Sequence, residues 1–194
     1  MAMPRFAPCP AHRLARDARR PVVAGLLAAA LGAAAASLPG MARASEVPEF
    51  RLKAAFVYNF TVFTEWPASV GPTLNLCLFG PDPFGAEIDT LHGKRAGDRL
   101  IAVHRRASVE SLRSCQVVFA SAGAIAQLPR IVEALRGLPV LTIADSPGAL
   151  QQGVVINMTE DRGRVAFEAN LQAARAAQLT LRANLLRLAS EVIR

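Results

Sequence analysis

The sequence has few of the residues from which metal sites and redox centres are built. Its 194 residues include three cysteines and three histidines. No two cysteines form a Cys-x-x-Cys pair, which argues against a thiol oxidoreductase. His92 and His104 fall in different expected elements, which argues against a metal ion held by both. We therefore expect no metal site and no cofactor.

Catalytic motifs are also missing. Gly80 and Gly85 have the spacing of the glycines in a phosphate-binding loop, but Ala86 and Glu87 stand where a lysine and a serine or threonine are needed. The chain has no nucleophile elbow and no His-Glu-x-x-His motif. Its carboxylates are scattered rather than paired. These absences predict a protein that is not an enzyme and has no catalytic residues.

Residues 1–44 have the pattern of a cleaved export signal. Several arginines precede an apolar, alanine-rich run over residues 22–38, and Ala42-Arg43-Ala44 then forms a small-x-small cleavage pattern. A membrane anchor is the alternative, but the run is short and weakly hydrophobic for a span of roughly 20 residues. We predict cleavage near Ala44-Ser45 and a mature periplasmic chain, residues 45–194, with no integral membrane segment.

The net charge of +7 comes mostly from this leader. Six of the 22 basic residues and one of the 15 acidic residues lie in residues 1–44, which leaves 16 basic and 14 acidic residues in the expected mature chain. A nearly balanced charge does not indicate nucleic acid as a partner. The remaining length is typical of a single domain, and no linker or internal repeat divides it.

Two cysteines, Cys77 and Cys115, remain after removal of the leader. An oxidising periplasm permits them to form a disulfide. By restricting the unfolded chain, such a bond would stabilise the fold by about 4 kcal/mol. Two buried free thiols are the alternative, because unpaired cysteine is commonly buried.

The hydrophobic periodicity predicts an α/β fold. A first helix is expected over residues 49–64, with Leu52, Phe56, Phe60 and Phe63 on one face, and Trp66-Pro67 ends it. Strands are expected over residues 74–80, 100–104, 115–120, 139–144, 154–158 and 164–168, and further helices over 84–91, 128–136, 171–177 and 182–192. The last two strands flank a four-residue hairpin loop, 160–163. We predict a single-domain layered α/β sandwich, with a mostly parallel sheet, an antiparallel edge hairpin and helices on both faces.

Several segments, in order, resemble the YfiR family. The first reads KAAFVYNFTVFTEWP and is similar to the opening pattern of that family, Lys-Ala-(Ala/Tyr)-Phe-x-Tyr-Asn-Phe-x-x-(Phe/Tyr)-x-x-Trp-Pro. The later ones read LCLFGPDPFG, SCQVVFAS, PVLTIADSPG and RVAFEANLQAARAAQLTLRANLLRLA. They occupy residues 53–67, 76–85, 114–121, 139–148 and 164–189. The resemblance covers nearly the whole expected mature chain.

The resemblance implies a periplasmic α/β protein that acts by protein contact. Characterised relatives repress an inner-membrane diguanylate cyclase by binding its periplasmic sensor domain, which links the family to cyclic di-GMP signalling and biofilm control, and members can form homodimers. Cys77 and Cys115 fall at positions that resemble one cysteine pair of the family. The second pair that some members carry is absent.

Four polar residues are candidates for partner contact. Tyr58 and Asn59 lie within the aromatic signature, where they could satisfy buried backbone groups or line a groove. Glu168 and Asn170 lie where a strand runs into a helix, so either an exposed contact edge or, for Asn170, capping of that helix is expected. The large aromatic residues of the signature, Phe56, Phe60, Phe63 and Trp66, are expected in the core.

The leading hypothesis is a non-enzymatic periplasmic repressor that holds the inactive conformation of a membrane diguanylate cyclase or a related sensor. The alternative is a periplasmic small-ligand binding module that serves another membrane sensor or a transporter. In that alternative, residues 80–85 and 145–148 both follow strands and would line a crevice at the carboxyl ends of the sheet.

Overall fold

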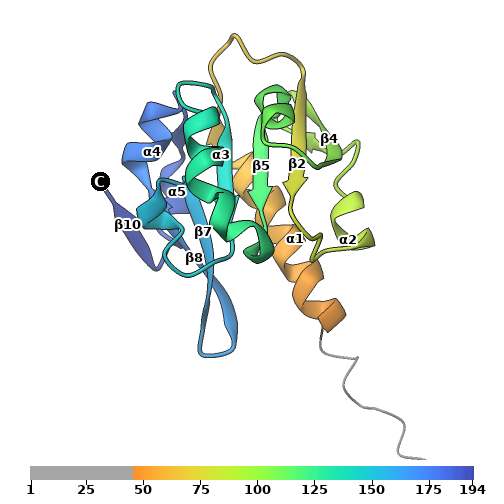
Figure 1. Ribbon diagram of the computed structural model, residues 1–194, viewed down its shortest axis with the longest axis vertical. Helices are drawn as coiled ribbons and strands as arrows, with labels where there is room; N and C mark the ends of the chain where they lie inside the picture. Colours follow the sequence, from red (N-terminus) through yellow and green to blue (C-terminus); the bar gives the residue numbers. More distant parts are fainter. Residues whose placement is uncertain (1–45) are drawn as a thin grey trace, which may run out of the picture. The chain divides into compact units, whose positions relative to one another are not determined.

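The computed structural model describes residues 46–194. The expected leader and its cleavage point near Ala44-Ser45 lie outside these residues. The described residues form an α/β domain around a sheet of eight strands in the order β10-β8-β7-β6-β5-β2-β4-β3 (Figure 1).

The strands of this sheet are β2 (Thr73–Phe79), β3 (Arg95–Ala96), β4 (Arg99–Arg106), β5 (Val117–Ala120), β6 (Leu141–Ala144), β7 (Ile156–Asp161), β8 (Arg164–Asn170) and β10 (Glu191–Ile193). The helices are α1 (Glu46–Val62), α2 (Ala86–Asp89), α3 (Leu128–Ala134), α4 (Leu171–Ala176) and α5 (Ala183–Leu186). Shorter 3-10 turns are η1 (Glu110–Ser114), η2 (Ala122–Gln127) and η3 (Leu150–Gln152). A separate ribbon pairs β1 (Thr64–Glu65) with β9 (Thr180–Leu181).

The predicted fold class is confirmed. Strands β4, β2, β5, β6 and β7 are parallel, and β8 joins them through an antiparallel hairpin with β7. All four residues of β5 and all four of β6 are buried, as expected for central strands that are covered on both faces. Helix α1 covers one face of the sheet and α3 covers the other (Figure 1).

Alternation along β2 divides the core into two layers. Leu74, Leu76 and Leu78 pack in the same cluster as Ala54, Val57 and Phe60 of α1. Cys77 and Phe79 point to the opposite face, into the cluster that contains Leu128 and Ile131 of α3. The period of two along an extended strand thus supplies both faces of the sheet with apolar side chains.

The buried face of α1 differs from the predicted one. Phe60 is fully buried and Trp66 is buried, but Phe56 and Phe63 are only partly buried and Leu52 is 46% exposed. The residues that contact the sheet recur every three positions, at Ala54, Val57 and Phe60. The helix also ends at Val62, before Trp66-Pro67. The aromatic spacing predicted the helix correctly but not its rotation about its axis.

The β7–β8 hairpin is confirmed, with a shorter loop than predicted. Asp161 pairs with Arg164, so the loop is Arg162-Gly163 rather than residues 160–163. Both loop residues have positive φ, 51° and 74°. Two-residue turns of this left-handed kind suit the twist of antiparallel strands. Strand β7 therefore continues to Asp161, three residues past its predicted end, whereas β8 begins at Arg164 as predicted.

The predicted helix over residues 182–192 is wrong. Helix α5 ends at Leu186, and Glu191–Ile193 instead forms β10, which runs parallel to β8 with Glu191 opposite Glu168. Ser190 donates hydrogen bonds from its backbone nitrogen (2.8 Å) and its hydroxyl (2.9 Å) to the Phe167 carbonyl. The open edge of β8 provides backbone partners, and this pairing overrides the weak helical periodicity of the segment.

Cys77 and Cys115 form a disulfide, with 6.1 Å between their Cα atoms. Both residues are buried, in the layer beneath α3. The bond joins the middle of β2 to the segment just before β5, so it fixes β2 to the start of the neighbouring strand. The alternative of two free thiols is not found.

Candidate binding cleft

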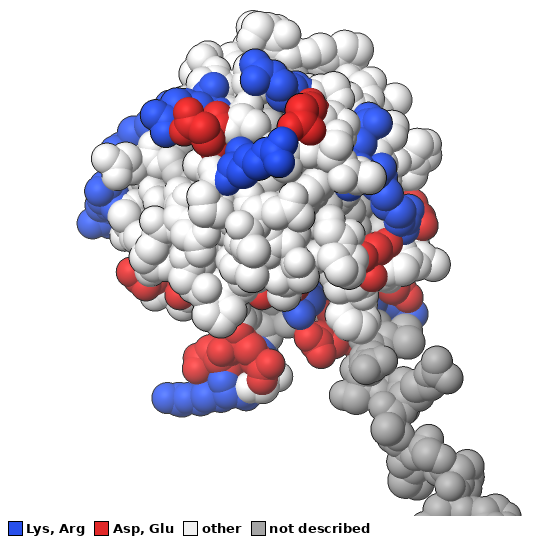
Figure 2. All heavy atoms as spheres, in the orientation of Figure 1, with Lys and Arg blue, Asp and Glu red and all other residues white. Residues whose placement is uncertain are grey.

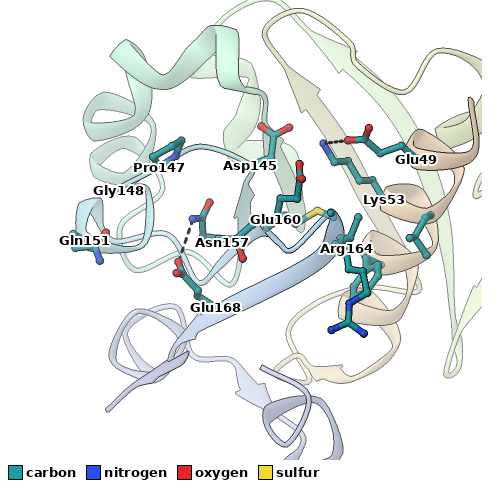
Figure 3. Close-up of a pocket in the computed structure, with 16 residues that line it drawn as sticks. Glu49, Lys53, Asp145, Pro147, Gly148, Gln151, Asn157, Glu160, Arg164 and Glu168 are labelled. Atoms are coloured by element: carbon teal, nitrogen blue, oxygen red, sulfur yellow. Dashed lines mark hydrogen bonds and ion pairs between the residues drawn. The ribbon is translucent and has the colours of Figure 1, made fainter. Parts of the chain in front are cut away.

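An open cleft of about 1210 Å³ lies between α1 and the β7–β8 hairpin (Figure 3). Helix α1 lines it with Leu52, Lys53 and Phe56. The loop that follows β6 contributes Asp145, and the hairpin contributes polar and apolar side chains that include Glu160. The cleft therefore lies beyond the carboxyl end of β6, which is where α/β sheets commonly bind their ligands.

Asp145 is a partly buried carboxylate at the end of β6. Burial raises the pKa of Asp145, and the nearby Lys53 ammonium opposes this effect. Its Oδ1 is buried and has no hydrogen-bond partner within residues 46–194. The structure thus holds a carboxylate in a position where its charge is only partly compensated.

We expect Asp145→Asn to stabilise the protein at neutral pH. Because its pKa is raised in the folded state, Asp145 lowers the free energy of unfolding as pH rises through the window between its unfolded and folded pKa values. The gain over the wild type in urea unfolding should be present at about pH 7 and absent at about pH 3. Asp161→Asn, at an exposed aspartate of the hairpin tip, should change stability by less than about 0.5 kcal/mol at both values. An equal gain at both pH values would contradict this assignment.

Lys53 reaches into the cleft from α1. Its ammonium forms an ion pair with Glu49, one helical turn earlier, at 2.9 Å. Figure 3 shows the Lys53 ammonium and the Asp145 carboxylate directed toward the same part of the cleft. The positive charge of Lys53 is thus already shared with Glu49, which leaves Asp145 without a full counter-charge.

Asn157 connects the loop after β6 to strand β8 of the hairpin. It is only 1% exposed. Its Oδ1 accepts a hydrogen bond from the backbone nitrogen of Ser146 (3.2 Å), and its Nδ2 donates to Oε2 of Glu168 (3.2 Å). Sequence analysis missed this residue, although an amide within the apolar stretch of residues 154–158 is a signal, since buried polar groups need partners.

The structure brings one of the four predicted contact residues into the cleft. Glu168 lines it, oriented by Asn157. Tyr58 lies elsewhere and donates from its hydroxyl to the Arg95 carbonyl (2.9 Å), so it anchors β3 to α1. Asn59 is exposed on α1, outside the cleft. A role in partner contact stays a prediction for these residues.

Asn170 is 8% exposed and caps α4, as the capping interpretation predicted. Its Oδ1 accepts a hydrogen bond from the Ala173 backbone nitrogen (2.8 Å), and its Nδ2 donates to the Leu150 carbonyl (3.4 Å). Contact of Asn170 with a partner is not tested by these bonds and stays a prediction.

We expect Asn170→Ala to lower the free energy of unfolding by about 1 kcal/mol or slightly more, because an N-cap and a buried hydrogen bond are lost together. Asn170→Ser keeps an oxygen that can cap the helix and should lose less than half as much. Urea unfolding of the purified variants measures both values. Equal losses for alanine and serine would show that capping is not what Asn170 contributes.

The two segments predicted to share a ligand crevice are separate. Asp145, Pro147 and Gly148 line the main cleft. Residues 80–82 instead line a smaller hollow of about 410 Å³, beside Arg105 and Arg106. Within residues 46–194, no three histidine, cysteine, aspartate or glutamate side chains are grouped so that they could hold a metal ion. In the same part of the chain, no helix has the length and hydropathy needed to span a bilayer.

Comparison with known protein families shows to which family this chain belongs. The sequence profile of the DUF4154 family, described as YfiR/HmsC-like, matches residues 50–190. This chain belongs to the YfiR/HmsC-like family. The matched region contains both cysteines and nearly all of the cleft. The family is regulatory rather than catalytic, and membership supports a role as a periplasmic regulator of diguanylate cyclase signalling.

Solved structures share the fold of this YfiR/HmsC-like chain. A conserved domain protein from Vibrio cholerae O1 biovar El Tor matches with a TM-score of 0.50 and 7% identity, over 74% of this chain and 60% of that chain. The ABC domain in complex with L-Trp from Streptococcus pneumonia matches with a TM-score of 0.50 and 9% identity, over 74% of this chain and 62% of that chain. At these identities the likeness shows the fold alone. A search of curated proteins found no significant match.

Proposed function

We propose that this chain is a non-enzymatic periplasmic repressor of an inner-membrane diguanylate cyclase. It binds the periplasmic sensor domain of the cyclase in its inactive conformation and releases it on an envelope signal, so it acts by a shift of population between two states. The observation that carries this proposal is the family match over residues 50–190. Export through residues 1–44 and a homodimeric state are parts of the same proposal.

The architecture of the described residues supports action by contact. The disulfide and the two-layered core make a rigid scaffold for the cleft walls, and rigid surfaces lose little entropy when they bind. The residues that line the cleft include no histidine or cysteine, the side chains that most often activate a nucleophile or transfer a proton.

Cellular cyclic di-GMP tests the proposal. We expect its level to rise when the gene is deleted from the native host and to fall again when the full chain is restored. A chain restored without residues 1–44 should fail to lower it, because it would stay outside the periplasm. An unchanged level under both ordinary and oxidising conditions would contradict repression of a cyclase.

A small-ligand binding module is the second candidate, and the position of the cleft at the carboxyl end of β6 favours it. A ligand that binds the folded protein alone raises its unfolding temperature. A thermal-unfolding screen of amino acids, amines and sugars would therefore detect such a module, whereas the repressor requires no ligand.

A further inference from the structure

The outer half of the β7–β8 hairpin extends beyond its neighbours in the sheet. Strand β6 pairs with β7 only at Ile156 and Asn157, and β10 pairs with β8 only over residues 168–170. Residues 158–167, here called the hairpin arm, pair across the hairpin from Met158–Phe167 to Asp161–Arg164 and pair with no other described strand. Figure 1 shows the arm projecting from the body of the domain.

One free edge of this arm borders the cleft. Met158, Thr159 and Glu160 of β7 line it, opposite α1. An unpaired strand edge presents backbone N–H and C=O groups that an extended peptide can pair with. The cleft, at about 1210 Å³, is larger than the roughly 300–1000 Å³ of compact small-molecule pockets. Its size and its open strand edge therefore fit a peptide segment better than a small molecule.

The charges around the cleft indicate which side chains a bound peptide segment would need. Glu49 is paired with Lys53, but Asp145 and Glu160 take part in no ion pair within residues 46–194. Arg164 points away from both carboxylates (Figure 3). The accessible charge facing α1 is therefore acidic, and complementary charge guides and orients protein association.

Apolar groups lie next to these carboxylates. Leu52 is 46% exposed and Phe56 is partly buried, and both line the cleft. Val165, which is partly buried, continues this apolar lining onto the hairpin arm. A peptide with a basic side chain next to an apolar one would match both the carboxylates and the apolar surface of the cleft.

We propose that the cleft is the groove in which the partner docks: an extended segment of the cyclase periplasmic domain pairs along the free edge of β7, with a lysine or arginine at Asp145 and Glu160 and an apolar side chain on Leu52. This inference rests on the proposed function and adds to it the site and the chemistry of the bound segment. The acidic residues of the arm thus act in recognition. Charged residues at a strand edge can also serve only to prevent unwanted pairing, and the experiment separates these roles.

Site-specific photo-cross-linking in the native host tests the groove. The photoreactive residue benzoylphenylalanine replaces either Leu52, in the cleft, or Leu188, which is 74% exposed and lies outside it. We expect the probe at position 52 to link to a membrane-bound cyclase, and mass spectrometry of the adduct to place the link in a segment with a basic residue beside an apolar one. The probe at position 188 should give little or none of this adduct.

Charge reversal provides the second readout. Glu160→Lys should reduce the adduct at position 52 by about tenfold or more and raise cyclic di-GMP toward the level of the deletion strain. Asp98→Lys, at an exposed aspartate outside the cleft, makes the same change of charge and should alter neither value. Urea unfolding of both purified variants checks that each is folded.

The outcomes separate the groove from the proposed function. Three results, each with normal repression, would overturn the groove but not the proposed repressor function. They are an adduct only from position 188, no adduct from either position, and no effect of Glu160→Lys. A link from position 52 to a second copy of this chain also overturns the groove and makes it a contact between copies. No response of cyclic di-GMP to deletion of the gene removes the proposed function and the groove together.

Discussion

Replacing Phe60 by alanine lowers the free energy of unfolding by about 3–5 kcal/mol. Phe60 is fully buried, and its ring centroid lies 4.9 Å from that of Phe167 on β8 and 5.8 Å from that of Phe56. Together with Phe56, whose ring centroid lies 6.2 Å from that of Phe167, it packs α1 on the hairpin side of the sheet. Removing the ring loses its hydrophobic transfer energy and leaves a cavity that the disulfide-linked sheet cannot easily close.

Two matched variants test whether the loss is specific to the Phe60 ring or follows from any substitution in α1. Phe60→Leu keeps most of the volume and should cost about 1.5 kcal/mol or less. Leu52→Ala, at a 46% exposed position on the same helix, should cost less than about 1 kcal/mol. Urea unfolding of the expected mature chain measures all three. A loss for Phe60→Ala no larger than that for Leu52→Ala would mean that α1 is not held by this aromatic contact.

Removing the disulfide with the double variant Cys77→Ala and Cys115→Ala lowers the free energy of unfolding by about 4 kcal/mol. The bond closes a loop of 38 positions, and the unfolded chain gains conformational entropy when that constraint is lost. Alanine is the right substitute because both positions are buried among apolar residues, where a serine hydroxyl would add a cost of its own. The unfolding temperature should fall by roughly 10 °C.

Reduction of the wild type provides the control. Unfolding in the presence of a strong thiol reductant should give a free energy close to that of the double variant, since both remove the same constraint. The double variant itself should not respond to the reductant. A double variant as stable as the oxidised wild type would contradict a stabilising role for the bond.

The central strands were predictable because each is specified by its own residues. Strands β5 and β6 are short apolar runs bounded by polar or turn residues, and such runs are typical of strands buried on both faces. The β7–β8 hairpin was also predictable, because a cluster of polar residues with a glycine separates two apolar segments. In these places, local sequence and tertiary structure agree.

The rest depends on contacts between distant parts of the chain. Residues 191–193 form a strand because the edge of β8 is open to them, which no local pattern reveals. Leu52 is exposed because the sheet selects a different face of α1 from the one marked by the aromatic residues. Periodicity indicates that a helix is amphipathic, but the packing partner decides its rotation.

The cleft could be predicted only in part. Residues 145–148 were expected to follow a strand and line a crevice, but the proximity of Asp145 to Lys53 requires α1 to cross the sheet at that place. The pairing of Ala144 with Asn157 brings the loop after β6 beside the hairpin. Of the four predicted contact residues, Glu168 alone lines the resulting cleft, because strand alternation and the Asn157 hydrogen bond direct its side chain there.

The most direct test of the account measures cellular cyclic di-GMP in a strain that lacks this gene and, in turn, each diguanylate cyclase that has a periplasmic domain. The account predicts that loss of the gene raises cyclic di-GMP, and that removal of one particular cyclase abolishes the rise completely. A rise that persists in every double-deletion strain, or no rise in the single deletion, would contradict repression of a membrane cyclase.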